Sequence, residues 1–156
     1  MQKCSFPLCQ RYGNSNYCLF HEKVYGNGAT KTKDQAIIPI PQLTEKAQNV
    51  VNAFIRNRDK SLGCITCGAQ VEDAGHYIPV GENSALRFEE DNIAGQCKKC
   101  NCHEYGNRAK FREALIQRIG LDRVKELEST AKFHKWSREQ LNNIISAYSV
   151  DKKAVA

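Results

Sequence analysis

The sequence places four cysteines in two CxxC pairs, and this spacing constrains the fold more than any other feature. The first pair is Cys64 and Cys67, the second is Cys97 and Cys100, and 29 residues separate the two pairs. Each pair can form a knuckle that presents two thiolates, and four thiolates complete a tetrahedral zinc site with no open position. The pattern therefore predicts a structural zinc clamp. A closed site does not catalyse hydrolysis, so any chemistry belongs to other residues.

The cysteine content also bears on the cellular compartment. The chain of 156 residues contains eight cysteines, and Met1 leads into Cys4 without the apolar segment of a signal peptide. No apolar run approaches the ~18 residues needed to cross a membrane. We therefore expect a cytoplasmic protein without membrane contact. Disulfides are rare in that compartment, so the paired cysteines indicate metal ligands, and disulfide bonds are the less favoured alternative.

A second set of metal ligands lies near the N-terminus. Cys4, Cys9, Cys18 and His21 follow the spacing C-x4-C-x8-C-x2-H, which is typical of a Cys3His zinc site made from two knuckles. So short a segment buries too little apolar surface to fold alone, and zinc binding would supply its folding free energy. A coincidental cysteine cluster is the alternative. The role of this knuckle stays open between contacting DNA, holding a partner and capping the main domain.

The order of segments predicts a small zinc-stabilised α+β protein. We expect an N-terminal zinc knuckle over residues 1–22, a linker over 23–43, a zinc-clamped domain with C-terminal helices over 44–150 and a tail over 151–156. The polar, glycine-containing composition of the second segment favours a flexible linker.

Apolar periodicity predicts helices on both sides of the cysteine-rich segment. Thr44 is the expected N-cap of the first helix. A single long helix is expected from about Cys100 to Ile119, followed by a further short helix. Ser137 and Gln140 match a capping box that opens a last helix.

Five polar residues between and just after the cysteine pairs are candidates for catalysis. His76 lies between the pairs, and a neutral imidazole can take a proton from water near pH 7. The Asn92 amide can accept from the other imidazole nitrogen or bridge to the backbone. Asn101 and His103 offer ligands for one divalent ion, and Asp73 is a further candidate ligand. The alternative is that the histidine is an ordinary surface or core residue.

Positive charge is concentrated directly after the second cysteine pair. Lysines and arginines number 23 against 17 aspartates and glutamates, which gives a net charge of +6. From residue 98 to residue 125 there are eight basic and three acidic residues, a balance that suits a phosphate backbone. A solvated helix face is the alternative, with about equal weight. The candidates for nucleic-acid binding are Lys98, Lys99, Asn107, Arg108, Lys110 and Arg112.

Together these motifs resemble the NinG (Rap) recombination proteins of lambda-like phages. The resemblance implies a DNA endonuclease with an HNH-like ββα-metal core that acts on branched recombination intermediates such as Holliday junctions and D-loops. It also implies recombination proteins of host or phage as partners, and the host cytoplasm as location. The matching pieces are Cys64-x2-Cys67, Ala74-Gly75-His76-Tyr77, Leu86-Arg87-Phe88, Asp91-Asn92-Ile93, Gln96-Cys97-x2-Cys100-Asn101-x-His103, Gly106-Asn107, Ile119-Gly120 and His134-Lys135-Trp136.

The resemblance also assigns roles to individual residues. By similarity to HNH enzymes, His76 takes the general-base position, and Asn101 occupies the helix position that often ligates the catalytic metal. Many HNH motifs have Asp or His immediately before the base, where this sequence has Gly75. Either Asp73 substitutes for that ligand or the helix residues hold the metal alone.

The leading hypothesis is therefore an endonuclease for branched or single-stranded DNA, with two structural zinc sites and Mg²⁺ or Mn²⁺ as the catalytic ion. Cutting a junction needs two incisions, so a homodimer is one arrangement that this hypothesis allows. The alternatives are a non-catalytic zinc-finger module that binds DNA and a zinc-stabilised module for protein interaction. Magnesium dependence separates catalysis from binding, because a binding module shifts DNA without nicking it.

Overall fold

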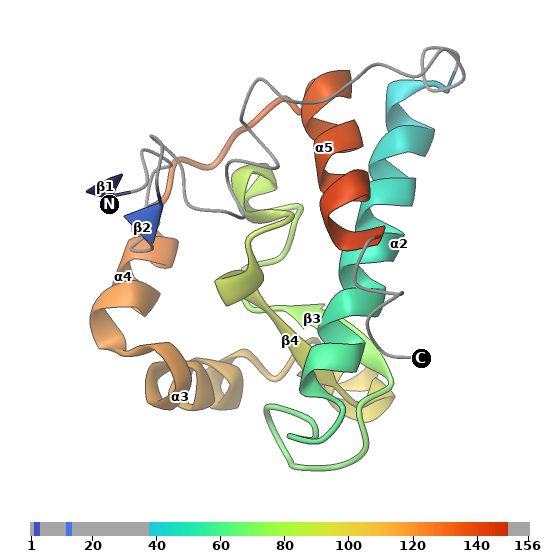
Figure 1. Cartoon of the computed structure of the whole chain (residues 1–156). Helices are drawn as coiled ribbons and strands as arrows, with labels where there is room; N and C mark the ends of the chain where they lie inside the picture. The colour runs from blue at the N-terminus through green and yellow to red at the C-terminus, as the bar shows by residue number, and fades with distance from the viewer. Residues whose placement is uncertain (1, 4–11, 14–37, 150–156) are drawn as a thin grey trace. The chain divides into compact units, whose positions relative to one another are not determined.

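The computed structural model describes residues 2–3, 12–13 and 38–149 (Figure 1). The chain divides into two compact units. Among the described residues, one unit contains those up to Val51 and those from Trp136 to Ser149, and the other contains residues 52–135.

The N-terminal residues that the structure describes form a short antiparallel pair. Strand β1 (Gln2–Lys3) pairs with β2 (Tyr12–Gly13). The expected tail over residues 151–156 lies outside the described residues, and so do the predicted ligands of the N-terminal zinc knuckle, Cys4, Cys9, Cys18 and His21.

The first unit contains the start of α2 (Ile40–Asp59) and all of α5 (Arg138–Ser149). Helix α2 begins before Thr44, so the predicted N-cap is wrong and the last residues of the expected linker are helical. Pro41 fits the first helical turn because its missing N–H would have no partner there. The Thr44 hydroxyl donates to the Ile40 carbonyl at 2.8 Å, a bond made inside the helix and not at its end.

The predicted capping box at the start of α5 is confirmed. The Ser137 backbone N–H donates to the Gln140 side-chain carbonyl at 2.9 Å, and the Gln140 N–H donates to the Ser137 hydroxyl at 3.2 Å. These bonds satisfy donors that the first helical turn leaves unpaired. The buried apolar residues of both helices recur at steps of three and four in this unit: Leu43, Ala47, Val51, Leu141, Ile144, Ile145 and Tyr148.

The second unit is built around a two-stranded antiparallel sheet. Strand β3 (Asp73–His76) pairs with β4 (Ile93–Gln96), and the first residue of β3 lies opposite the last residue of β4. All four residues of β4 are buried, so this strand lies inside the unit. Figure 1 shows the two strands running side by side near the end of α2.

Short turns connect the strands, and helices follow them. The turns η2 (Ser84–Leu86) and η3 (Glu90–Asn92) lie between the strands, and the π-helical turn η4 (Lys99–His103), α3 (Arg108–Ile119) and α4 (Leu121–Ser129) come after β4. No helix in the described ranges is both long and apolar enough to cross a bilayer. The α+β class is confirmed, and the core of this unit is formed by Tyr77, Ile78, Leu86, Ala94, Phe111, Leu115, Val124 and Leu127.

The predicted single long helix after the second cysteine pair is wrong, because the backbone breaks between η4 and α3. Tyr105, Gly106 and Asn107 all have left-handed backbone conformations, with φ of 50°, 81° and 47°. The Gly106 N–H donates to the carbonyls of Cys100 at 2.9 Å and Asn101 at 3.1 Å, which closes the first segment. The turn therefore separates η4 from α3, whose apolar period begins at Phe111.

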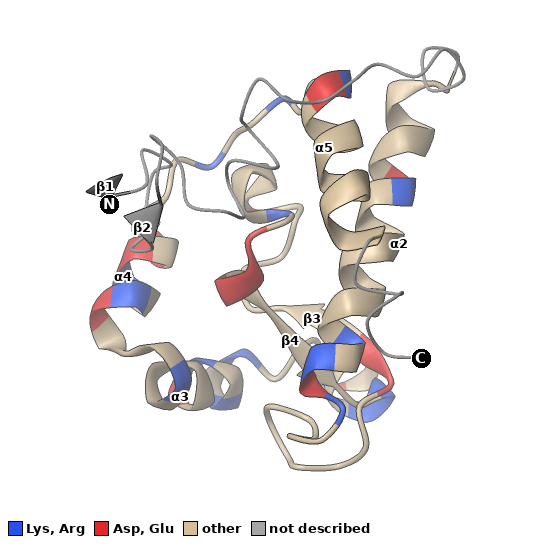
Figure 2. Ribbon diagram, viewed as in Figure 1, with Lys and Arg blue, Asp and Glu red and all other residues tan. Residues whose placement is uncertain are grey.

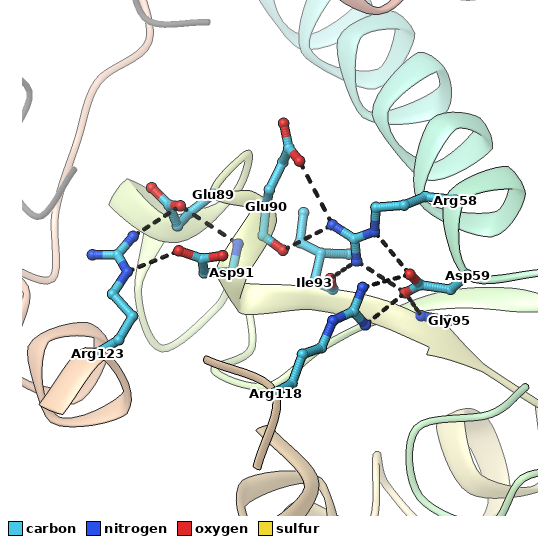
Figure 3. Close-up of polar contacts among 9 residues, drawn as sticks. All are labelled: Arg58, Asp59, Glu89, Glu90, Asp91, Ile93, Gly95, Arg118 and Arg123. Atoms are coloured by element: carbon cyan, nitrogen blue, oxygen red, sulfur yellow. Dashed lines mark hydrogen bonds and ion pairs between the residues drawn. The ribbon is translucent and has the colours of Figure 1, made fainter. Parts of the chain in front are cut away.

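A buried carboxylate ties the end of α2 to β4 and α3 (Figure 3). Asp59 is 1% exposed and accepts hydrogen bonds from Arg58 at 2.8 Å and Arg118 at 2.7 Å. The Gly95 N–H also donates to it at 2.8 Å. Burial alone would raise the pKa of Asp59, but these donors hold it well below its usual range. Asp59 is therefore ionised and fixes the position of β4.

A second ion-pair group holds the turn that leads into β4. Arg123, on α4, is buried and lies 3.1 Å from Glu89 and 2.8 Å from Asp91. Burial raises the pKa of Glu89 to about 7, although the Arg123 guanidinium opposes this shift. Figure 3 shows that the two groups flank the start of β4, so charge pairing restrains this strand at both sides.

Candidate functional site

The four cysteines of the CxxC pairs converge as the sequence predicts. The Sγ atoms all lie within 4.8 Å of one another, and those of Cys67 and Cys97 are 3.7 Å apart. A zinc ion with Zn–S bonds of about 2.3 Å holds tetrahedral thiolates about 3.8 Å apart. All four cysteines are free thiols, so the set fits a structural zinc ion: Cys64, Cys67, Cys97 and Cys100.

Backbone hydrogen bonds shape the first knuckle. The Cys64 N–H donates to the Ala69 carbonyl at 2.7 Å, and the Gly68 N–H donates back to the Cys64 carbonyl at 2.8 Å. Gly68 has a φ of +76°, which favours glycine at this turn. A Cβ at Gly63 would lie 2.6 Å from the Gly68 carbonyl oxygen, so the turn also needs glycine there. The two glycines let the chain fold back tightly enough to present both thiols.

The surroundings favour thiolate at Cys64 but not at Cys100, where, despite a hydrogen bond with Thr66, burial and the neighbouring thiols raise the pKa to about 12. Burial would raise the pKa of the Cys64 thiol, but the Thr66 hydroxyl, 3.1 Å from its Sγ, and nearby backbone groups lower that pKa to about 6. Cys102 is not part of the four-sulfur cluster. It is exposed, and its thiol donates to an Asp73 carboxylate oxygen at 3.9 Å.

A zinc ion held by these four cysteines would fix η4 relative to the sheet. Cys97 follows β4 directly and Cys100 lies in η4, so one knuckle spans the junction of strand and turn. The Ile65 N–H donates to the Gly95 carbonyl at 2.9 Å, which attaches the other knuckle to β4. The side chains of η4 are therefore held at a defined position beside β3.

His76 is the last residue of β3, and its ring is held by a main-chain carbonyl. Nε2 lies 3.0 Å from the Arg87 carbonyl oxygen. A carbonyl only accepts, so Nε2 carries the hydrogen and Nδ1 of the neutral ring keeps its lone pair. Burial lowers the pKa of His76 below its ordinary value of 6.5, so the ring is neutral at pH 7. This tautomer and charge state are those of a proton acceptor.

Asn92 uses its whole side chain to bind the backbone. It is fully buried, its Oδ1 accepts from the Ile78 N–H at 2.8 Å, and its Nδ2 donates to the carbonyls of Ile78 at 3.0 Å and Leu86 at 3.2 Å. Of the two predicted alternatives, the structure contains the bridge to the backbone. Asn92 therefore holds both ends of the segment that precedes the Arg87 carbonyl, which in turn holds His76.

The structure brings two of the predicted metal ligands together. The Asn101 Nδ2 lies 3.4 Å from an Asp73 carboxylate oxygen, although 27 residues separate them in the sequence. Their side chains come from η4 and from the start of β3. His103 is exposed at the end of η4, and its contribution to a metal site stays a prediction.

Sequence reasoning missed Gln96, the fully buried last residue of β4. Its Nε2 donates to the Gly106 carbonyl at 2.9 Å. A Cβ at Gly75 would lie 1.9 Å from the Gln96 Oε1 and 3.1 Å from the Asn101 Oδ1. The Gln96 amide therefore occupies the space that a side chain at position 75 would need. The sequence signal was the glycine before His76, but the register that selects Gln96 is visible only in the fold.

The family model described as Bacteriophage Lambda NinG protein matches residues 21–156. The chain belongs to the NinG family. The resemblance inferred from the motifs is thereby confirmed at the level of the family, and the HNH type remains a prediction.

Curated NinG relatives align over most of this chain. It is 43% identical over 121 residues to Protein ninG of Salmonella phage P22, which covers 76% of this chain and 60% of the relative. It is 42% identical over 121 residues to Protein ninG of Escherichia phage lambda, covering 76% and 59%. The chain thus spans about 60% of the length of these relatives. No solved structure matches it.

The predicted DNA-binding residues of this NinG-family chain are not all equally available. Figure 2 shows basic segments on α3 and charges of both signs on α4. Arg108 lies 3.0 Å from Glu82, whereas Lys98 and Lys110 are exposed and form no ion pair with any residue that the structure describes. The role of all six in DNA binding stays a prediction. The four that contact acidic side chains are Lys99, Asn107, Arg108 and Arg112.

Proposed function

We propose that this chain is a divalent-metal-dependent endonuclease of the HNH type that hydrolyses phosphodiesters in branched or single-stranded DNA. The observation that carries the proposal is the environment of His76, whose Nε2 donates to a main-chain carbonyl and whose Nδ1 is left to accept a proton. The resemblance to NinG (Rap) recombination proteins supports branched intermediates, such as Holliday junctions and D-loops, as substrates.

In this proposal His76 is the general base. Nδ1 takes a proton from the attacking water, and the bond from Nε2–H to the Arg87 carbonyl keeps the ring oriented and stabilises the imidazolium that forms. The lowered pKa keeps the base unprotonated at neutral pH. Asn92 acts as a positioning residue, because its three bonds hold the segment that carries the Arg87 carbonyl.

Asp73 and Asn101 are the proposed ligands of Mg²⁺ or Mn²⁺, with His103 as a further candidate. Side chains alternate along a strand, so Asp73 and Gly75 share one face of β3 and His76 lies on the other. When bound, the ion neutralises charge on the scissile phosphate and stabilises the departing 3′ oxygen. In-line displacement needs attack and departure on opposite sides of phosphorus, so the scissile phosphate would have to lie between the His76 face of β3 and the face that carries Asp73.

Basic residues after β4 would hold the DNA backbone. Lys98 and Lys110 can contact phosphates directly, whereas Arg108 and Arg112 must first exchange Glu82 and Glu128 for phosphate oxygens. A homodimer would supply the second incision that a junction needs. Host or phage recombination proteins are the proposed partners.

The test is incubation of the zinc-loaded chain with labelled junction, duplex and single-stranded DNA in Mg²⁺, Mn²⁺ or EDTA. We expect junction cleavage with Mg²⁺ or Mn²⁺ and none with EDTA. His76→Ala should keep zinc and DNA binding and lose at least about a hundredfold in cleavage rate. Added imidazole should restore part of the cleavage rate of His76→Ala, because it can replace the missing base. It should not restore the cleavage rate of Asp73→Asn, because that variant lacks a proposed metal ligand.

Two results would overturn the proposal. The first is cleavage by His76→Ala at the rate of the unaltered chain. The second is tight DNA binding without nicking at any divalent ion concentration, which would favour the non-catalytic zinc-finger function.

A further inference from the structure

One buried acceptor in the second unit has no hydrogen-bond donor among the residues that the structure describes. It is the Oε1 of Gln96, a residue with 0% exposure. The atom of the Gln96 amide that lies 2.9 Å from the Gly106 carbonyl oxygen must be the nitrogen, Nε2, because a carbonyl can only accept a hydrogen bond. The orientation of the amide is therefore fixed, and its oxygen faces away from Gly106.

This oxygen faces the space left by Gly75, beside Asn101. A point at the Cβ position of Gly75 lies 1.9 Å from the Gln96 Oε1 and 3.1 Å from the Asn101 Oδ1, so the two oxygens are at most about 5 Å apart. Asn101 also contacts the Asp73 carboxylate, with its Nδ2 at 3.4 Å. Oxygen ligands of Mg²⁺ at about 2.1 Å lie about 3 Å apart when adjacent and about 4.2 Å apart when opposite. The amide oxygens of Gln96 and Asn101 thus lie within reach of one ion, and the Asp73 carboxylate adjoins them through the Asn101 amide nitrogen.

We propose that the Gln96 Oε1 is a third ligand of the divalent ion, supplied from β4 in the place where position 75 of β3 has no side chain. The inference rests on the proposed function, and it adds a residue to the set expected from the sequence. One carboxylate and two amide oxygens form a hard ligand set, which suits Mg²⁺ or Mn²⁺. With a single negative charge, the set binds the ion weakly until a phosphate adds its own charge.

The competing explanation is that Gln96 only braces the turn before α3 through its bond to Gly106. The two ends of the amide separate these explanations. Gln96→Glu keeps an oxygen facing Gly75 and adds negative charge, but loses the donor to Gly106. If residue 96 is a ligand, Gln96→Glu should bind the ion more tightly than the unaltered chain. If residue 96 only supports the turn before α3, the affinity for the ion should not increase. Gln96→Leu keeps most of the volume and loses both functions.

The experiment is a titration of the zinc-loaded full chain with Mn²⁺, in which electron paramagnetic resonance measures free Mn²⁺. Gln96→Leu should raise the Kd for Mn²⁺ by about tenfold or more, and Gln96→Glu should lower it. Gln117→Glu is the matched control, because it adds the same charge at an exposed position of α3 and should leave the Kd within about twofold. Retained zinc content shows that each variant is folded.

The outcomes distinguish this inference from the proposed function. If Asp73→Asn abolishes Mn²⁺ binding while Gln96→Glu binds no more tightly than the unaltered chain, the metal site stands and Gln96 is a brace. Unchanged affinity in a folded Gln96→Leu also overturns the inference. If the unaltered chain shows no Mn²⁺ binding that depends on Asp73, both the inference and the proposed metal site fail. If Gln96→Leu loses zinc and is therefore unfolded, the test rests on the Kd for Mn²⁺ of Gln96→Glu compared with that of Gln117→Glu.

Discussion

Replacing Asn92 with alanine should destabilise the second unit more than any exposed asparagine replacement can. The side chain is fully buried and makes three hydrogen bonds to the backbone of Ile78 and Leu86. Each bond contributes about 1 kcal/mol, and each backbone group left unpaired in the interior costs about 1–3 kcal/mol unless water reaches it. We therefore expect a loss of about 3–4 kcal/mol, a large share of the ~5–15 kcal/mol of a typical domain.

The assay is urea unfolding of the zinc-loaded chain, followed by far-ultraviolet circular dichroism. With a urea dependence of about 2 kcal/mol per molar, the midpoint should fall by about 1.5–2 M. Asn92→Asp should lose at least as much, because it keeps the acceptor for the Ile78 N–H but turns a negative oxygen toward two carbonyls. Asn57→Ala, at an exposed position of α2, is the control and should change stability by less than about 0.5 kcal/mol.

A midpoint for Asn92→Ala close to that of Asn57→Ala would refute this reasoning, since it would mean that the three bonds add nothing to the folded state. The variant also tests the path from Asn92 to His76. Because the bridged segment leads to the Arg87 carbonyl, cleavage should fall further than the loss of folded protein accounts for. Cleavage that fell only in proportion to folded protein would remove the positioning role.

The other predictions concern zinc, pH and the buried carboxylate. Cys64→Ser should lose the central zinc, measured by atomic absorption, whereas Cys102→Ser should retain it, because only Cys64 belongs to the four-sulfur cluster. Cleavage should lose rate as the pH drops through the pKa of His76, which lies below 6.5, so a pH–rate profile with an acidic midpoint above about 7 would contradict the assigned base. Asp59→Asn should cost about 3–5 kcal/mol at pH 7, because it leaves two guanidinium groups without their partner. The folded-state pKa of Asp59 is lowered, so its contribution to the free energy of unfolding is present above its ordinary pKa of 3.8 and is lost as the pH falls toward the folded-state pKa. The free energy of unfolding should therefore change less between pH 7 and pH 3 for Asp59→Asn than for the unaltered chain.

The features that could be predicted from sequence were those set by short spacing. A CxxC pair forms a knuckle through bonds that span only a few residues, such as Gly68 N–H to the Cys64 carbonyl, so its geometry follows from local sequence. The capping box of Ser137 and Gln140 was predictable for the same reason. The pairing of one CxxC with the other followed from the coordination number of structural zinc, which is four.

The features that were mispredicted depend on competition between local signals. The apolar period of Phe111, Leu115 and Ile119 does not reach back across residues 105–107, and Gly106 marks the break before it. The left-handed backbone of Tyr105 is unfavourable for an aromatic residue, and the bonds from Gly106 to the carbonyls of η4 offset that cost. At the start of α2, the expected linker included Pro41, although proline is well suited to a first helical turn.

The relation between Gly75 and Gln96 could not be derived from local sequence, because it depends on strand register. A slip of one residue in the pairing of β3 with β4 would turn Gln96 to the opposite face of the sheet. Register is fixed from outside the strands, by the bond from the Gly95 N–H to Asp59 and by the zinc clamp that begins at Cys97. A zinc ion bound by the four cysteines would therefore do more than stabilise the unit, because it would help to hold the register that places the Gln96 amide beside position 75. A side chain at position 75 and a glutamine at position 96 would occupy the same space in this register. The glycine before His76 and the glutamine before the second knuckle therefore depend on each other.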